Sequence, residues 1–289
     1  MAKVKDVLQA LDDLTNGRCV KDPSDWAAGK NSFVVTKSSN IPGKSCTEIP
    51  GLVWGDPEKE VKKIAVSMFA TPELVKRAAA WGADLLIVHE PTYYNHMDEH
   101  SDEKLECEKR ALIESTRITI YRFHDHAHAA APDMIVAGEE KYMQLDAKVE
   151  SMDGFDCLRL VLNHAMTARE VAAHLEKTLG IRHIRICGAA DVPCNRVTGM
   201  FGTPGGVFDE LKSEQCEILM TGEATEWKLD EYARDAAQLG HKKALLVLGH
   251  IGSERAGMQY VCDYLRKTHP ELECEYFECG EVYTYTDCQ

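Results

Sequence analysis

The feature that most constrains the fold of this chain is the alternation of short apolar runs with stretches of helical periodicity. Residues 85–88 and 244–248 are apolar throughout and far too short to cross a bilayer, so they are predicted to be buried strands. Apolar residues recur at helical spacing in segments such as 72–81 and 168–179. Strands that are apolar on both faces belong to sheets covered by helices. The sequence therefore predicts an α/β fold with mixed, largely parallel sheets.

The same reading gives an order of elements along the chain. Strands are predicted at residues 63–69, 84–89, 118–123, 158–162, 183–187, 196–201, 216–220, 244–248 and 274–277. Helices are predicted at residues 4–14, 72–81, 101–115, 168–179, 207–213, 225–239 and 253–268. Residues 16–55 lack periodicity, apart from one short predicted strand at 32–36. We expect two α/β lobes, one formed by residues 1–135 together with 241–289 and the other by residues 136–240.

Charge and cysteine content exclude several classes of protein. The net charge of −14 argues against a nucleic-acid groove and against an anionic membrane surface as partner, because both require clustered Lys and Arg. The N-terminal residues interleave charges with apolar positions, unlike a signal peptide. The 11 cysteines are odd in number and scattered, without a C-x-x-C pair, which is typical of reduced thiols. We therefore expect a cytoplasmic protein.

Ligand-type side chains follow three of the predicted strands. These are His89 and Glu90, His124, and His250. In open α/β sheets, ligands bind beyond the carboxyl ends of strands, where loops and helix N-termini converge. His250 and Glu254 are four residues apart at the start of a predicted helix, so they share one face and can converge on one ion.

Further spacings in these segments bear on how many ions are held. His124 and His128 are also four residues apart, and His126 would share their face if the backbone were extended. His89 and Glu90 are adjacent at a strand end, so they point apart, toward two different ions. Imidazole and carboxylate ligands suit zinc, iron, manganese or nickel. Each residue alone has an ordinary structural explanation, such as a backbone hydrogen bond for a strand-end His or a favourable helix dipole for Glu254. Taken together, they favour a metal site.

At these residues the chain resembles the Nif-three-like dinuclear-metal family, whose bacterial members are commonly called type 2 GTP cyclohydrolase I homologues. Five segments carry the resemblance, in the family's order. They are Gly51-Leu-Val-Trp-Gly-Asp-Pro57, Asp84-Leu-Leu-Ile-Val-His-Glu-Pro91, His124-Asp-His-Ala-His128, Thr221-Gly-Glu223 and Gly249-His-Ile-Gly-Ser-Glu254. Two positions depart from the family pattern: Glu90 replaces a His, and His128 replaces an Asp. The two exchanges compensate, which preserves the number of ligands and the formal charge of the site.

The resemblance implies a ligand set and a place for the site. It puts two divalent ions at strand ends between the two lobes. Glu254 would bridge the ions, with His89 and His128 on one of them and Glu90 and His250 on the other. His124 would lie directly behind the ligands, and His124 and His126 are both kept as further candidate ligands.

The resemblance also implies a function and an assembly. We expect a metal-dependent hydrolase that acts on a nucleotide-like or other small substrate, with Glu223 or Glu226 accepting a proton from water. The alternative is a metal-binding oligomeric scaffold or regulatory interaction protein without turnover. A homohexamer is implied in either case. The turn Gly202-Thr-Pro-Gly-Gly206 precedes a predicted helix, where it fits an anion site but more commonly marks a plain turn.

Overall fold

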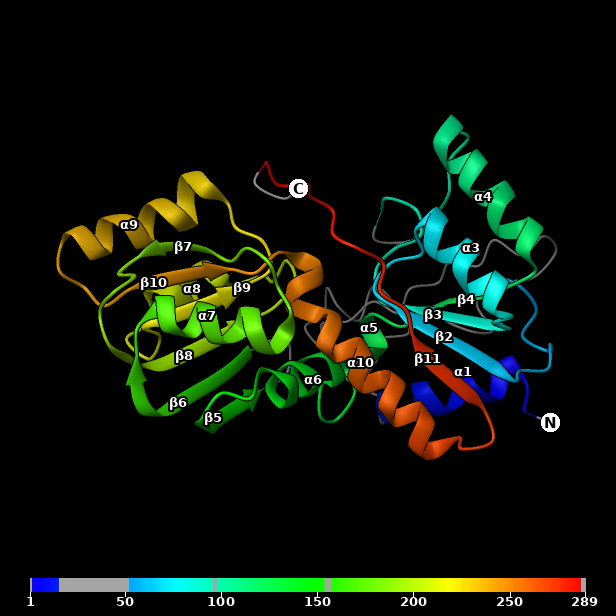
Figure 1. Ribbon diagram of the computed structural model, residues 1–289, viewed down its shortest axis with the longest axis horizontal. Coiled ribbons are helices and arrows are strands. Elements are labelled where there is room, and N and C mark those ends of the chain that lie inside the picture. The colour runs from blue at the N-terminus through cyan, green and yellow to red at the C-terminus, as the bar shows by residue number, and fades with distance from the viewer. Residues whose placement is uncertain (1, 16–51, 96–97, 154–156, 287–289) are drawn as a thin grey trace, which may run out of the picture. The chain divides into compact units, whose positions relative to one another are not determined.

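The computed structural model of the chain describes residues 2–15, 52–95, 98–153 and 157–286 and divides into two compact units (Figure 1). The first unit comprises residues 1–131 and 258–289, and the second comprises residues 132–257. The chain returns to the first unit at residue 258, later than the expected 241, because the strand at 244–247 belongs to the second unit's sheet. The strand expected at residues 32–36 lies outside the described residues.

The first unit is built on a five-stranded sheet in the order β1-β4-β3-β2-β11. Its strands are β1 (Leu52–Trp54), β2 (Lys63–Ser67), β3 (Leu85–Val88), β4 (Thr119–Arg122) and β11 (Glu273–Tyr276). All neighbouring pairs are parallel except β1 with β4. In the register, Val88 of β3 lies beside Arg122 of β4, so these two strands end at the same level. The residues that follow them therefore leave the sheet side by side.

Helices cover this sheet and close its core. They are α1 (Val4–Asp12), α3 (Pro72–Trp81), α4 (Lys104–Thr116), α5 (Asp125–Ala129) and the part of α10 (His250–Thr268) that begins at residue 258. Helix α3 begins where the Thr71 side chain accepts a hydrogen bond from the backbone N–H of Leu74, and Pro72 occupies its first turn. It ends at Gly82, whose φ of 87° is a left-handed conformation that glycine adopts without strain. These local signals determine where the helix begins and ends, and the limits predicted from the sequence are confirmed.

The second unit contains a six-stranded mixed sheet in the order β5-β6-β8-β9-β10-β7. Its strands are β5 (Ala147–Asp153), β6 (Cys157–Met166), β7 (Arg185–Gly188), β8 (Cys194–Met200), β9 (Ile218–Thr221) and β10 (Ala244–Val247). The three central strands β8, β9 and β10 are parallel, and antiparallel strands flank them on both sides. Its helices are α6 (Met134–Met143), α7 (Ala168–Leu179), α8 (Val207–Lys212), the π-helical segment Glu226–Asp230, α9 (Glu231–Gln238) and the first turns of α10.

The α/β fold class is confirmed, and the limits predicted for the helix at 168–179 are also confirmed. The structure adds four elements that the sequence pattern did not predict, namely β1, α5, α6 and β5. Helix α5 is only five residues long, β1 only three, and β5 carries mostly polar residues, so these three lack enough apolar periodicity to be recognised. Helix α6 buries residues around more than one face, so its sequence has no single apolar stripe. None of the helices in the described part of the chain is long and apolar enough to cross a membrane.

Helices α6 and α10 approach each other closely within the second unit. A Cβ atom on Gly138 would lie 2.5 Å from Cα of Gly257, and one on Gly257 would lie 2.5 Å from Cα of Ile135. Beside this contact, the buried carboxyl group of Glu139 accepts a hydrogen bond from the backbone N–H of Ala256 at 3.0 Å. Burial holds the pKa of Glu139 well above its usual value. The two glycines thus set the distance between backbones at the helix that carries His250 and Glu254.

We predict that Gly138→Ala destabilises the protein by about 1–3 kcal/mol, because the added methyl group meets backbone atoms that cannot move aside. Denaturant unfolding followed by circular dichroism measures the change. Gly205→Ala is the matched control, since a Cβ atom there meets nothing within 4 Å. Equal stability of the Gly138 variant and the parent would contradict the close packing of α6 on α10.

Candidate metal centre

His89 follows β3 and is held in one tautomer by the neighbouring strand. Its side chain is fully buried, and Nδ1 lies 3.0 Å from the backbone carbonyl oxygen of Phe123. A carbonyl oxygen only accepts, so Nδ1 carries the proton and Nε2 presents a lone pair. Burial, followed by the charges of His124 and His128, holds the pKa of His89 well below its usual value. His89 is therefore a neutral imidazole, the form that binds a metal ion.

The backbone at His89 is fixed from both sides. The N–H groups of His89 and Glu90 both donate to the carbonyl oxygen of Met68, at 3.1 and 3.0 Å. The buried Arg122 side chain donates from Nε to the carbonyl oxygen of His89 at 3.2 Å. These bonds keep the strand end rigid, which a preorganised ligand site requires.

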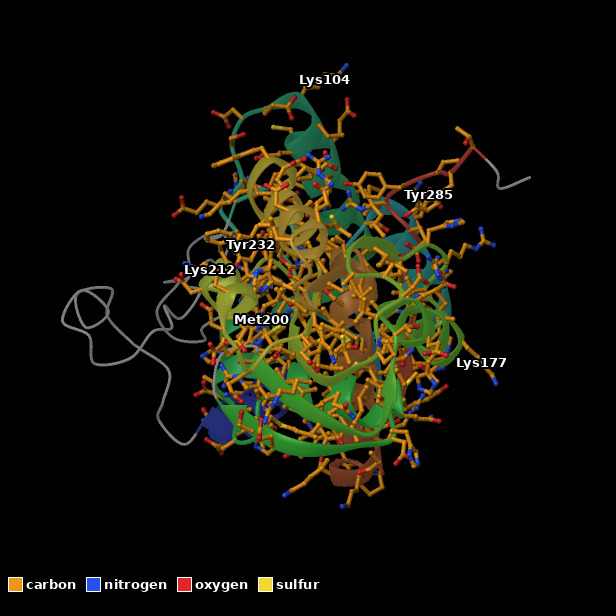
Figure 2. All side chains as sticks on the ribbon, turned by 90° about the vertical axis from the view of Figure 1, so that its left-hand side faces the viewer. Lys104, Lys177, Met200, Lys212, Tyr232 and Tyr285 are labelled. Carbon is orange, nitrogen blue, oxygen red and sulfur yellow. The ribbon has the colours of Figure 1, made fainter. Side chains whose placement is uncertain are left out.

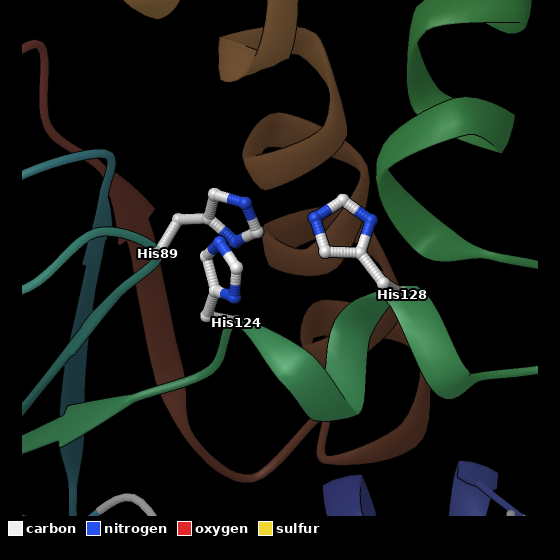
Figure 3. Close-up of side chains that lie close together, drawn as sticks. All are labelled: His89, His124 and His128. Atoms are coloured by element: carbon white, nitrogen blue, oxygen red, sulfur yellow. The ribbon is translucent and has the colours of Figure 1, made fainter. Parts of the chain in front are cut away.

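Three imidazole rings meet at this edge of the first unit's sheet (Figure 3). The ring centroids of His89 and His124 are 4.6 Å apart, and His128 lies 5.0 Å from His89 and 5.1 Å from His124. One ligand nitrogen from each ring lies within 4.8 Å of the other two. Two nitrogens bound to one tetrahedral zinc ion are about 3.4 Å apart, so the three rings would have to close in on one another to bind a single ion.

His124 is oriented by the residue that follows it. Its Nδ1 lies 2.7 Å from Oδ1 of the buried Asp125, which fixes the proton on Nδ1 and turns Nε2 toward the cluster. Nε2 in turn lies 3.9 Å from Oε1 of Glu90, which is itself buried. His124 is expected behind the ligands or among them, and the structure places its ring as close to His89 as the ring of His128. The adjacent Asp125 was the sequence signal for this arrangement.

His126 points away from the three rings because residues 125–129 form a helix. An extended backbone would have put it on the face of His124 and His128, but a helix turns by about 100° per residue. Its Nε2 lies 3.2 Å from Asp12 of α1, and its Nδ1 lies 3.4 Å from the hydroxyl group of Tyr121. The helix keeps His128 on the face of the cluster, four residues after His124.

In the second unit, His250 and Glu254 lie on one face of α10, as their spacing predicts. Nε2 of His250 is 3.1 Å from Oε2 of Glu254, and Nδ1 is 2.7 Å from Oε1 of Glu223. A neutral ring that donates from Nδ1 to Glu223 turns the lone pair of Nε2 toward the buried carboxylate of Glu254. Two acceptors face each other in that case, which is favourable only with a proton or a cation between them. A carboxylate behind a ligand imidazole is also the usual outer partner of a metal site.

The loop after β8 leaves room for the Glu254 carboxylate. A Cβ atom on Gly202 would clash with Oε1 of Glu254, and the φ of Gly202 is +63°. Its backbone N–H donates to Oγ of Ser253 at 3.0 Å. The left-handed backbone favours glycine at the start of the glycine-rich turn, and a side chain there would displace the carboxylate from its present position.

The two candidate proton acceptors differ in their surroundings. Glu223 contacts His250 directly, whereas Glu226 forms an exposed ion pair with Arg185 at 3.1 Å. Thr203 was not singled out from the sequence, but its hydroxyl group lies 3.3 Å from Nδ1 of His250.

Comparison with known proteins identifies the family of the chain. A family model described as Duf34/NIF3 (NGG1p interacting factor 3) matches residues 44–281 of the chain. The chain belongs to the Duf34/NIF3 family. Among curated relatives, a GTP cyclohydrolase 1 type 2 homolog from Clostridium perfringens is 26% identical over 211 residues, which cover 71% of this chain and 78% of the relative. A protein of the same name from Chlamydia pneumoniae is 25% identical over 226 residues, covering 76% of this chain and 85% of the relative.

Solved structures share the Duf34/NIF3 fold at lower identity. Protein ybgI, described as of unknown function, has a TM-score of 0.69 at 18% identity, covering 98% of this chain and 100% of its own. Staphylococcus aureus protein SA1388 also has a TM-score of 0.69, at 16% identity, covering 100% of this chain and 99% of its own. At these identities the likeness extends to the fold alone.

We predict that His128→Ala weakens metal binding by at least about tenfold, because it removes one of three converging imidazoles. His126→Ala is the matched control. It lies two residues away on the same helix and is equally buried, but it faces Asp12. Titration with cobalt or zinc, followed by absorbance or competition with a chelator, measures both affinities. Equal losses in the two variants would show that the three-imidazole cluster does not hold the ion.

Proposed function

We propose that this Duf34/NIF3 protein is a metal-dependent hydrolase that holds two divalent ions and acts on a nucleotide-like small molecule. The proposed ligands are His89, Glu90, His128, His250 and Glu254, with His124 beside them as a further candidate. Zinc, iron, manganese and nickel all suit imidazole and carboxylate donors. Ions of this kind act as Lewis acids that activate water and polarise the bond to be cleaved.

The observation that carries the proposal is the cluster of three imidazoles at the ends of β3 and β4, of which His89 and His128 are buried. A metal ion binds the neutral form of imidazole, and His89 is held in that form with its Nε2 turned away from the backbone. His250 and Glu254 add a second pair in which a lone pair faces a carboxylate. The relatives named GTP cyclohydrolase 1 type 2 homolog support a nucleotide as the substrate class.

The residues around His250 suggest how a proton would be handled. Glu223 lies 2.7 Å from Nδ1 of His250 with a side chain that is 54% exposed, so it both orients the ring and remains accessible to solvent. We propose Glu223, in preference to Glu226, as the proton acceptor. Glu226 instead forms an exposed ion pair with Arg185 at 3.1 Å.

A second candidate function is a metal-binding interaction protein without turnover. The family description, NGG1p interacting factor 3, names an interaction and not a reaction. The two functions differ in one measurable property. A hydrolase loses turnover with a chelator and regains it with added metal, whereas a scaffold has no turnover to lose.

Hydrolysis is tested by incubating the purified chain with purine nucleotides, with and without a chelator, after the metal content has been measured. We expect product only with metal bound, and at least about a hundredfold less product from Glu223→Gln, because general-base catalysis contributes this much. Metal content equal to that of the parent in this variant separates a catalytic loss from a loss of ions. A fully loaded protein that turns over none of the nucleotides would leave the scaffold function as the better account.

Glu254→Gln is predicted to reduce metal occupancy at both positions, whereas His250→Ala reduces chiefly one. A bridging carboxylate offsets the repulsion between two dications, and an amide of the same shape does not. Elemental analysis of gently purified protein, with up to two ions per chain expected for the parent, measures the occupancy. If the Gln variant binds two ions as tightly as the parent, Glu254 does not bridge them.

We also propose that the chain assembles as a homohexamer, as its resemblance to the family implies. The net charge of −14 would keep such assemblies apart in solution. Light scattering at micromolar concentration should give a mass near six times 32.3 kDa. A monomer under these conditions would rule out the hexamer.

A further inference from the structure

The second unit has a pocket beside His250 that has so far been given no role. Its volume is about 170 Å³. Its lining includes Thr203, Phe208, Glu223, Thr225, Lys228 and Leu229. A cavity of about 150 Å³ holds one benzene molecule, so this pocket accommodates one planar ring system and not a whole nucleotide.

The apolar wall of the pocket is anchored in the core of the second unit. Leu229 is 2% exposed and belongs to the cluster of buried side chains beneath β9 and β10. The Phe208 ring packs against that cluster and meets the Tyr232 ring edge to face, with centroids 5.3 Å apart. This wall is rigid and apolar, which suits the faces of a planar ring.

Two opposite charges also line the pocket. The ammonium group of Lys228 lies 4.7 Å above the Phe208 ring, which holds it at the wall. Lys228 forms no ion pair with any residue in the described ranges, although Asp209 lies near enough to interact electrostatically. The carboxylate of Glu223 is the anion of the pocket. A ligand with a negative group and a hydrogen-bond donor would satisfy both charges.

Two of the side chains that line the pocket also contact the candidate metal ligand His250. Glu223 and Thr203 both line it, and both contact Nδ1 of His250, at 2.7 and 3.3 Å. A molecule bound there is separated from His250 by a single side chain. The pocket is therefore placed to hold the part of a substrate that lies next to the reacting group.

We propose that this pocket binds the nitrogen heterocycle of an anionic, nucleotide-like ligand. The ring lies against Phe208 and Leu229, an N–H edge donates to Glu223, and the anionic group meets Lys228. The choice of a nucleotide as the ligand class rests on the function proposed above. The expectation that the ligand combines one planar ring with one anionic group rests on the residues that line the pocket. Lys228 then sets the preference for a charged ligand over its neutral counterpart.

The test uses GMP and guanosine as probes of the intact chain, because they differ only in the phosphate group. Isothermal titration should give at least about tenfold tighter binding of GMP, the effect of one charge-assisted hydrogen bond. Lys228→Met should remove this difference while leaving guanosine affinity within about twofold of the parent value.

Lys212→Met is the matched control for the charge. Lys212, labelled in Figure 2 together with Tyr232, also places its ammonium group 4.7 Å above the Phe208 ring, but it pairs with Asp209 and does not line the pocket. It should leave the affinity for both probes unchanged. Equal losses of GMP affinity in the two Lys variants, or no binding of GMP by the parent at millimolar concentration, would overturn the proposal.

A second pair of variants tests the location. Ala224 lines the pocket, so Ala224→Phe should weaken both probes at least about tenfold by filling the ring site, and Ala224→Leu should act in the same direction with a smaller added volume. Unchanged affinity in a folded Ala224 variant would place the probes elsewhere.

The binding measurement does not depend on turnover, so it separates the two proposals. A chain that binds GMP but no metal refutes only the hydrolase, and one that binds metal but not GMP refutes only the pocket.

Discussion

The arrangement of the candidate metal centre depends on the parallel pairing of β3 with β4. The two strands end in register, and the hydrogen bonding continues past their ends, where the N–H of Phe123 donates to the carbonyl oxygen of Val88. The carbonyl oxygen of Phe123 then accepts from the ring of His89. Phe123 thus aligns the ends of the two strands and also fixes the tautomer of His89. Without this pairing, the three imidazole rings would not gather at one edge of the sheet.

The second unit reaches a similar result with different means. There the ring of His250 is oriented by a side chain, Glu223, and not by a backbone carbonyl group. A carboxylate makes a stronger acceptor than a carbonyl group and raises the basicity of the opposite nitrogen. It also remains accessible to solvent, which a buried carbonyl group does not. In both units an oxygen atom that accepts from Nδ1 orients a histidine ring. In the second unit the same oxygen-bearing group, the Glu223 carboxylate, is also the proposed proton acceptor.

Close backbone packing surrounds the ligands of α10. Gly202 leaves space for the Glu254 carboxylate, and Gly138 and Gly257 bring α6 and α10 into contact. Buried Glu139 bonds to the backbone two residues beyond Glu254. Larger side chains at Gly138 or Gly257 would meet backbone atoms and push α6 and α10 apart, beside the turns that carry His250 and Glu254. Functional geometry here rests on small residues as much as on the ligands themselves.

The sequence by itself determined the fold class, the limits of helices such as 72–81 and 168–179, and the residues that follow β3, β4 and β10, because periodicity and capping are local properties. It also placed His250 and Glu254 on one helix face. Only the tertiary structure decided that β10 belongs to the second unit, that His124 joins His89 and His128, and that His126 turns toward Asp12. These outcomes depend on strand pairing and on a five-residue helix. Both are fixed by contacts between residues distant in sequence, which no local pattern encodes.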